Sequence, residues 1–552
     1  MVAFLPGCTP PPTEYDVVIR NAKIYDGSGN PPMTGIVAIQ ADTIAAVGEL
    51  ANVIGRTEWD AQGMAVSPGF INMLSWATES LIQDGRAMSD LKQGVTLEVM
   101  GEGTSMGPLN EAMKRGFKAR QGDIQYEIEW TTLGEYLEFL ARKGVSPNVA
   151  SFVGATTLRL HEIGGRDRAP TAEELLQMQA LAAEAMEEGA VGLGTALIYA
   201  PGFYAETEEL IALAQTVGQF DGRYLTHMRS EGNRLLEGID EVIRIAKEGQ
   251  LGAEIYHLKA AGKQNWHKLD QVIAKIDSAQ AAGIDLTTNM YTYTAGATGL
   301  DAAMPPWVQE GGYLAWKRRL QTPAIRKRVK AEMKTDATDW ENLYFSAGSP
   351  EKVVLVGYNN PELRKYTGKT LAEVAKERGT DPEDTIIDLV IEDGSRVGTV
   401  YFLMSEENVQ RQIQLPYMTF GSDEETPATE GVFLESNPHP RAYGNVARLL
   451  GTYVRDEGLI PMEEAIHKLT ALPAEHLKLR KRGKLAVGYY ADVVVFDPDS
   501  IQDHATFAEP HQYATGVEHV FVNGEQVIRA GEHTGATPGR VVRGPGWKGW
   551  KE

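Results

Sequence analysis

The sequence predicts an α/β protein whose central part is a parallel (β/α)8 barrel of the TIM type. Short apolar segments alternate with longer segments of helical periodicity through the middle of the chain, which is typical of a parallel barrel. Apolar runs bounded by turn residues recur at both ends of the chain and indicate one β domain built from the two termini. With 552 residues, the chain is long enough for a barrel and a smaller second domain.

The expected order of elements follows the chain. Residues 1–14 form a tail, residues 15–65 and 485–552 form the β domain, and residues 66–484 form the barrel. The barrel strands are expected near residues 65–73, 96–101, 148–154, 190–197, 223–227, 253–257, 285–291 and 416–423. Because about 125 residues separate the last two strands, we expect an insertion at about residues 300–410.

Composition excludes several classes of function. The formal net charge of -22 repels phosphate backbones and anionic membranes, so we expect a small-molecule partner and no nucleic acid. No stretch approaches the roughly 20 apolar residues that span a bilayer, so we expect no transmembrane segment. Composition leaves the oligomeric state open.

The single cysteine excludes an internal disulfide but suggests a location. Leu5-Pro-Gly-Cys8, followed by a proline-rich stretch, resembles the end of a bacterial lipoprotein signal. On that interpretation Cys8 carries a lipid anchor, and the protein is periplasmic or membrane-anchored. The alternative is a cytoplasmic protein in which Cys8 is an ordinary residue of the tail.

Two histidines are candidate metal ligands because each closes an apolar run. His227 and His257 end neighbouring predicted strands, and Asp423 ends the last one. Active-site residues of parallel barrels gather where the strands end, and neutral imidazole is a common zinc ligand. The alternative is that each histidine is a hydrogen-bonded structural residue.

Several motifs occur in a fixed order along nearly the whole chain. They include Ser67-Pro-Gly-Phe-Ile, Thr226-His-Met-Arg, His257-Leu-Lys-Ala-Ala-Gly, Gly421-Ser-Asp and His439-Pro-Arg-Ala-Tyr-Gly. Together they resemble the amidohydrolase superfamily, and within it the pattern is similar to the N-acyl-D-amino-acid deacylases, or D-aminoacylases. The resemblance implies a barrel fused to a β-sandwich, a zinc ion at the strand ends and hydrolysis of an N-acyl amide.

The resemblance also implies roles for individual residues. His227 and His257 fall on two zinc ligands of the family, and Asp423 falls on its catalytic carboxylate, which moves a proton from water to the leaving amine. We therefore expect a metal-dependent amide hydrolase that acts on N-acyl amino acids or related acylated amines. The alternatives are a catalytically degenerate barrel that binds acylated or peptidic ligands, and a cyclic-amide hydrolase.

The chain departs from the family at two ligand positions. Where the family has Asp-x-His-x-His, this sequence reads Asn72-Met-Leu-Ser-Trp, and neither Leu74 nor Trp76 can bind a metal. The family's ligand cysteine is replaced by Gly103, so we expect Glu102 to supply an oxygen instead, unless it caps a turn or faces solvent. The sequence thus predicts one divalent metal, zinc by its ligands, held by His227, His257 and Glu102, with its occupancy open.

Three residues are predicted to contact the substrate. Lys259 falls on a lysine that binds the substrate carboxylate in the family, with an ordinary surface lysine as the alternative. Tyr293 falls on a tyrosine near the substrate, with core packing as its alternative. Arg441 is expected to bind an anionic group or to hold Asp423 through a fork-like ion pair, with structural anchoring of its loop as the alternative. The serine that follows in the family is Ala297 here, so one expected carboxylate contact is missing.

Overall fold

The computed structural model describes residues 12–550 of the chain. Cys8 and most of the predicted tail lie outside the described residues, so the lipid anchor stays a prediction. Among the helices of the described part, none combines the length and the apolar character that crossing a membrane requires.

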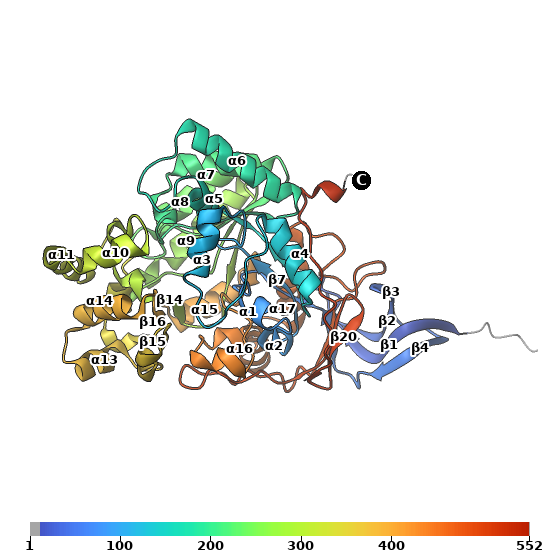
Figure 1. Cartoon of the computed structure of the whole chain (residues 1–552). Coiled ribbons are helices and arrows are strands. Elements are labelled where there is room, and N and C mark those ends of the chain that lie inside the picture. Colours follow the sequence, from blue (N-terminus) through green and yellow to red (C-terminus); the bar gives the residue numbers. More distant parts are fainter. Residues whose placement is uncertain (1–11, 551–552) are drawn as a thin grey trace, which may run out of the picture.

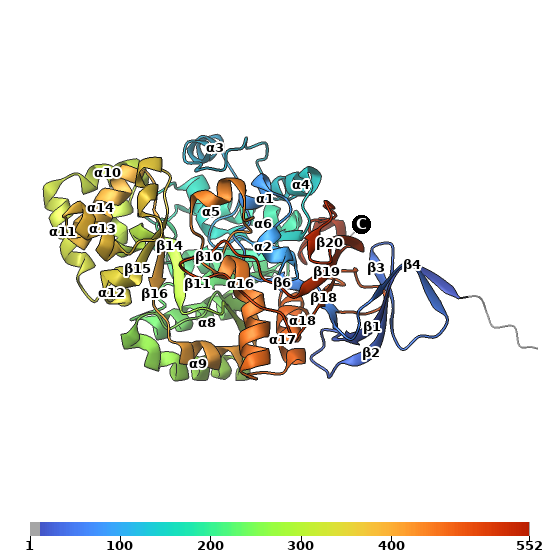
Figure 2. The ribbon, with the colours of Figure 1, turned by 90° about the horizontal axis from the view of Figure 1, so that it is seen from below.

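One nine-stranded sheet combines strands from both ends of the described chain. Its strands run in the order β21-β20-β19-β18-β5-β1-β2-β3, and β4 pairs with β1. In Figure 2, β18 to β20 lie beside β1 to β3 at one end of the molecule. The bounds are β1 Thr13–Ile24, β2 Met33–Gln40, β3 Thr43–Gly48, β4 Val53–Asp60, β5 Ala65–Pro68, β18 Val493–Phe496, β19 Val517–Val522, β20 Glu525–Arg529 and β21 Glu532–His533. A two-layer sandwich is not shown by this sheet and stays a prediction.

Every predicted barrel segment contains a strand, and these strands form two parallel sheets. The third segment, predicted as one strand over residues 148–154, is divided into β8 and β9, which belong to different sheets. One has the order β17-β13-β12-β11-β10-β9 and the other β6-β7-β8. The bounds are β6 Phe70–Asn72, β7 Val95–Met100, β8 Asn148–Ser151, β9 Val153–Gly154, β10 Gly192–Ala196, β11 Arg223–His227, β12 Ala253–Ile255, β13 Leu286–Met290 and β17 Met418–Phe420. Every residue of these strands is buried, as expected for parallel strands that are covered on both faces.

Helices follow the strands and cover their outer side (Figure 1). They are α5 Ala155–Glu162, α6 Ala172–Glu187, α7 Thr207–Gly218, α8 Leu235–Gly249, α9 Leu269–Ala281, α15 Glu406–Ile413 and α17 Met462–Leu469. This alternation establishes the α/β class. Backbone hydrogen bonds connect the edges of the two sheets, from Met73 N to Phe420 O (3.1 Å) and from Asp423 N to Leu74 O (2.8 Å). Because no continuous ladder runs around the ring, full closure stays a prediction.

The first predicted strand is divided between two sheets, which corrects the prediction of a single strand over residues 65–73. β5 belongs to the nine-stranded sheet and β6 to the barrel, and Gly69 separates them. A Cβ atom at Gly69 would lie 2.0 Å from the Thr96 hydroxyl oxygen, so only glycine permits the close approach of β6 and β7 there.

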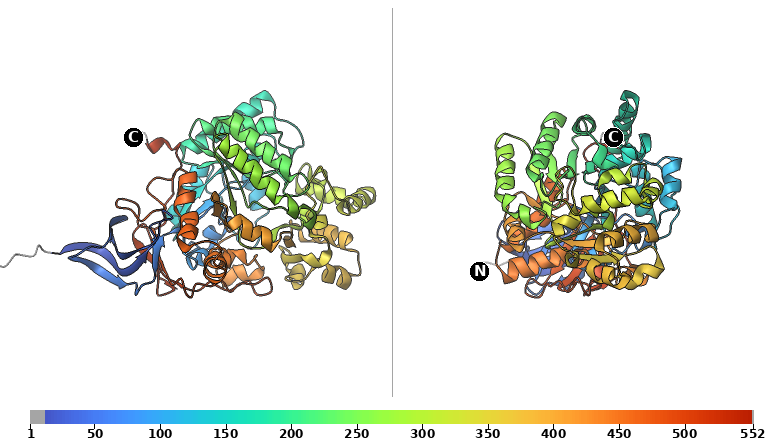
Figure 3. Two further views of the ribbon diagram at one scale, coloured as in Figure 1. Left: turned by 180° about the vertical axis from the view of Figure 1, so that it is seen from behind. Right: turned by 90° about the vertical axis from the view of Figure 1, so that its left-hand side faces the viewer.

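The segment predicted as an insertion forms a cluster of its own at the end of the molecule opposite the N-terminal strands (Figures 1 and 3). It contains a three-stranded sheet of order β14-β16-β15 and a separate hydrophobic core. Its elements are β14 Ala295–Gly299, α10 Tyr313–Leu320, α11 Pro323–Met333, α12 Leu343–Ala347, β15 Val353–Gly357, α13 Leu371–Arg378, α14 Pro382–Asp393 and β16 Gly398–Phe402.

A buried ion pair stabilises the helical layer, and its loss should destabilise the fold. Arg159 on α5 lies 2.6 Å from Glu209 on α7, with side chains 1% and 4% exposed. The substitution Arg159→Met leaves a buried carboxylate unpaired, so we expect a loss of about 3–5 kcal/mol, measured from urea unfolding midpoints.

The control is the ion pair between Arg244 and Glu208, whose side chains are 45% and 69% exposed. The substitution Arg244→Met should cost no more than about 1 kcal/mol, because solvent screens this pair. Equal losses in the two variants would show that burial of the Arg159 pair is not what matters.

Candidate metal centre and active site

Three predicted ligands converge at the carboxyl ends of the barrel strands. His227 is the last residue of β11, His257 follows β12, and Glu102 follows β7. Glu102 Oε1 lies 3.2 Å from His227 Nδ1 and 3.1 Å from His257 Nε2. One donor atom from each of the three residues lies within 4.8 Å of the others, and all three side chains are buried.

This donor set suits a divalent metal of the zinc type. Two imidazole nitrogens and a carboxylate oxygen are zinc ligands, and three protein ligands leave a coordination position open in catalytic sites. His227 Nε2 is buried and has no hydrogen-bond partner in the described structure, which is costly unless another group satisfies it. Glu102 itself faces the two imidazoles and is 4% exposed, so it does not face solvent.

The backbone explains why the carboxylate stands one position before the family's cysteine. Gly103 has φ +65°, and a Cβ atom there would lie 2.6 Å from the Cβ of Ala196. A longer side chain at residue 103 would require the neighbouring strand to move. Glu102 supplies the oxygen from the adjacent position.

A second carboxylate, which the sequence analysis missed, completes the buried cluster. Glu231 Oε1 lies 3.0 Å from His257 Nδ1 and 2.7 Å from Lys259 Nζ, and Glu231 Oε2 lies 3.5 Å from His227 Nε2. Its only sequence signal is its place four residues after His227. Glu231 is thus positioned either to orient the imidazoles or to serve as a further ligand.

Electrostatics of the cluster favour charged carboxylates. Burial would raise the pKa of Glu102, but His257 and His227 hold it below its usual range. Burial would also raise the pKa of Glu231, yet the imidazoles and Lys259 lower it. For His257, burial and Lys259 favour the neutral form, but Glu231 and Glu102 outweigh them and raise its pKa to about 9.

Asp423 lies beside this cluster, three residues after the end of β17. Its backbone is in the left-handed region with φ 54°, which turns its side chain toward the strand ends. The indole nitrogen Nε1 of Trp76 donates to both Asp423 Oδ1 and Glu102 Oε2, each at 3.1 Å. The predicted catalytic carboxylate and the predicted metal ligand are therefore linked through one side chain.

Arg441 lies against Asp423, where it combines an ion pair with a contact that anchors the loop, and the pair is not the fork-like one that was predicted. Its Nη1 lies 2.8 Å from Asp423 Oδ2, and its Nη2 donates to the Asp423 carbonyl oxygen at 2.6 Å. The guanidinium also lies over the Tyr291 ring, 4.3 Å from the ring centroid. Burial raises the pKa of Asp423, and Arg441 opposes that shift.

Of the two remaining predicted residues, Lys259 lies within the cluster of buried charges and Tyr293 lies farther from it. Lys259 lies within it, because its Nζ is 2.7 Å from His257 Nδ1. Tyr293 packs edge-on against His439, and its hydroxyl lies 3.4 Å from the Pro440 carbonyl oxygen. Tyr291, which the sequence analysis did not select, contacts both His257 and Arg441 with its ring.

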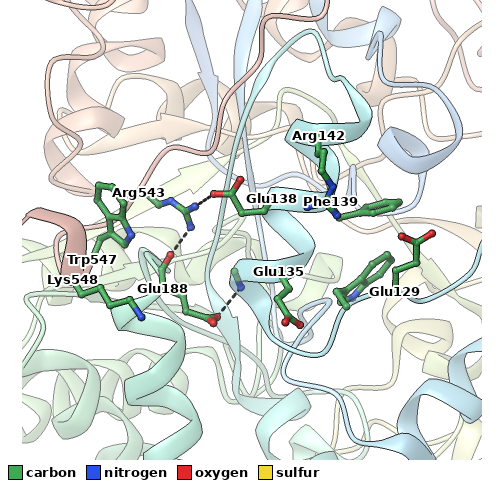
Figure 4. A pocket seen from close by; sticks show the side chains of 11 residues that line it. Glu129, Glu135, Glu138, Phe139, Arg142, Glu188, Arg543, Trp547 and Lys548 are labelled. Carbon is green, nitrogen blue, oxygen red and sulfur yellow. Dashed lines mark hydrogen bonds and ion pairs between the residues drawn. The ribbon is translucent and has the colours of Figure 1, made fainter.

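A small cavity borders the candidate site, and a larger cavity lies away from it. A cavity of about 10 Å³ lies beside His257, Lys259 and Tyr293 and extends to Met404 and Gln412. A larger cavity, about 410 Å³, lies between α4 (Leu133–Lys143) and the C-terminal segment (Figure 4). Arg543 pairs with Glu138 in that cavity, and no candidate site residue lines it.

Comparisons with known proteins agree with this geometry. A family model described as "Amidohydrolase family" matches residues 395–528. A D-aminoacylase of Alcaligenes xylosoxydans xylosoxydans is 32% identical over 532 residues, which cover 96% of this chain and 97% of that protein. The chain belongs to the D-aminoacylase family of amidohydrolases. The expectation of an amide hydrolase that acts on linear amides is thereby confirmed for the family.

Solved structures of the family superpose over nearly the whole chain. An N-acyl-D-glutamate deacylase from Bordetella bronchiseptica, complexed with zinc and a phosphonate inhibitor, is 29% identical with a TM-score of 0.79, covering 96% of this chain and 100% of that chain. A D-aminoacylase with a binuclear metal centre, described as showing one-metal activation and second-metal attenuation, is 31% identical with a TM-score of 0.80 over the same shares.

Metal affinity of this family member should increase with pH. Because the pKa of His257 is raised to about 9, this imidazole is protonated below that pH, and zinc must displace the proton. We expect the apparent zinc Kd to fall about tenfold per pH unit between about pH 6.5 and 8.5, measured by chelator competition. The variant His504→Asn, altered at an exposed histidine, should show the same slope. A Kd independent of pH would contradict this assignment.

Proposed function

We propose that this protein removes the acyl group from N-acyl amino acids of the D configuration, using one zinc ion held by His227, His257 and Glu102. The observation that carries this proposal is the convergence of these three donors within 4.8 Å of one another. Their neighbour Asp423 supplies a carboxylate that can exchange a proton. The D configuration is taken from the relatives, which include a D-aminoacylase and an N-acyl-D-aspartate deacylase.

A zinc ion bound at these residues would lower the pKa of water toward about 7 and polarise the scissile carbonyl. Asp423 then accepts the proton of the attacking water and delivers it to the leaving nitrogen. Burial raises the pKa of Asp423, which makes its carboxyl group a better proton acceptor. Arg441 positions this residue through an ion pair with its carboxylate and a hydrogen bond to its backbone carbonyl oxygen.

Lys259 is proposed to orient the carboxylate of the substrate. Its ammonium group has three N–H donors, and Glu231 accepts one of them. A substrate carboxylate can share this cation without displacing Glu231. Tyr293 is proposed to support the wall of the same small cavity, which it lines together with Lys259.

A single metal is favoured over a pair. Leu74 and Trp76 occupy the two positions that carry histidines in the family, and Leu74 is 1% exposed within a hydrophobic cluster. In the D-aminoacylase with a binuclear centre, one metal activates and the second attenuates. A site limited to one metal is therefore consistent with catalysis, and the degenerate ligand-binding alternative is less well supported.

The finer architecture and the location belong to the same proposal. We propose a closed barrel that starts at Phe70, after β5, and continues to residue 484 with an insertion at about residues 300–410, and a β-sandwich built from residues 15–68 and 485–552. The hydrogen bonds between the two parallel sheets and the joint nine-stranded sheet support these boundaries. A location at the cell envelope rests on the Cys8 motif of the sequence alone.

The substitution Asp423→Asn should abolish turnover while zinc remains bound. An amide cannot accept the proton, so we expect kcat to fall by at least about 100-fold. Activity would be measured on a panel of N-acyl-D- and N-acyl-L-amino acids, with zinc content determined by elemental analysis. The matched variant His227→Ala should lose both zinc and activity. Full activity of Asp423→Asn, or of the chelator-treated protein, would overturn the proposed mechanism.

A further inference from the structure

Trp76 occupies a position that has no role in the proposed mechanism. Its backbone is fixed, because Trp76 N donates to the Glu424 carbonyl oxygen at 2.9 Å and Ser75 N donates to Val99 O at 2.9 Å. The indole is partly buried and packs against a core cluster that includes Leu74. From this fixed point the ring reaches the two carboxylates that matter most to the proposed site.

The single N–H of the indole has two acceptors on different residues. It lies 3.1 Å from Glu102 Oε2 and 3.1 Å from Asp423 Oδ1. An indole N–H can only donate, so both contacts require carboxylate oxygens as acceptors, and such charge-assisted contacts are stronger than neutral ones. Trp76 therefore holds together two like-charged groups that would otherwise repel each other.

The second oxygen of each carboxylate faces another group of the proposed site. Glu102 Oε1 faces both imidazoles, and Asp423 Oδ2 faces Arg441. With one oxygen of each carboxylate on the indole, the rotation of each carboxylate group is fixed. The angle at which Glu102 presents Oε1 to a metal thus depends on Trp76.

We propose that Trp76 is a positioning residue whose indole N–H bridges Glu102 and Asp423 and takes the place that a second cation would occupy between them. The proposal rests on the proposed function, since it concerns the same site. It gives a role to Trp76, which stands at a position where the family has a metal-binding histidine. It also predicts that the wild-type protein binds one zinc ion per chain and is not inhibited by excess zinc.

The test compares Trp76→Phe with Trp316→Phe. Both changes keep a large aromatic ring and remove an indole N–H, but the Trp316 N–H is buried without a hydrogen-bond partner in the described structure. For Trp76→Phe we expect kcat to fall about 10- to 100-fold with KM within about twofold, and zinc affinity to weaken about tenfold. Trp316→Phe should leave kcat, KM and zinc affinity at wild-type values. Wild-type kcat and zinc affinity in Trp76→Phe would overturn the proposal.

A spectroscopic measurement keeps the test independent of turnover and of the folding of Trp76→Phe. In protein labelled with ¹⁵N-tryptophan, the indole N–H resonance of Trp76, assigned from its loss in Trp76→Phe or in Trp76→Leu, should shift when Asp423 is replaced in Asp423→Ala. The Trp316 resonance should not shift. A Trp76 resonance unchanged by Asp423→Ala would overturn the bridge. If the wild-type protein hydrolyses no N-acyl amino acid with zinc bound, the proposed function fails, whereas zinc affinity and this resonance still decide the role of Trp76.

Discussion

The proposed site depends on the need to pair every charge that is buried at the strand ends. Glu102 and Glu231 lie on either side of His257, and their side chains are each 4% exposed. Burying an isolated carboxylate costs several kcal/mol, so each must face a cation or a strong donor. The two imidazoles and Lys259 supply these partners, and removing any one of them leaves a buried charge without compensation.

The same constraint extends from the metal ligands to the proposed proton carrier. Asp423 is paired with Arg441 on one side and with the Trp76 indole on the other. The Arg441 guanidinium is itself buried and lies over the Tyr291 ring, whose face attracts a cation. Each group in the chain from His257 to Arg441 is therefore held by its neighbours, which favours a rigid site over one assembled by the substrate.

Much of this arrangement could be predicted from the sequence, because it follows from where strands end. His227 and His257 close apolar runs, and parallel strands bring such residues to one edge. Glu102 was predicted from its offset by one residue from the family's cysteine position. Glu231 was missed because it lies in the loop after His227, where no periodic pattern marks a residue that faces the site. The division of the first strand at Gly69 was also missed, because it results from contact with Thr96 on a neighbouring strand.

Asn72 stands where the family has an aspartate, two residues before the first replaced histidine position. Its amide group lies among buried carboxyl groups. Asn72 Nδ2 lies 3.0 Å from both Asp90 Oδ2 and Glu98 Oε2, and 2.8 Å from the Ser422 hydroxyl.

Burial raises the pKa of Asp90 to about 6, and burial together with Asp90 raises the pKa of Glu98. An aspartate at residue 72 would add a third carboxyl group to this buried pair, whereas the amide donates to both. Asn72 Oδ1 also accepts the Ser422 N–H at 2.8 Å, one residue before Asp423. The neutral amide at this position therefore satisfies both buried carboxyl groups and anchors the loop that carries Asp423. The apolar side chains at residues 74 and 76 and the amide at residue 72 are therefore compatible with the proposed site for a single metal.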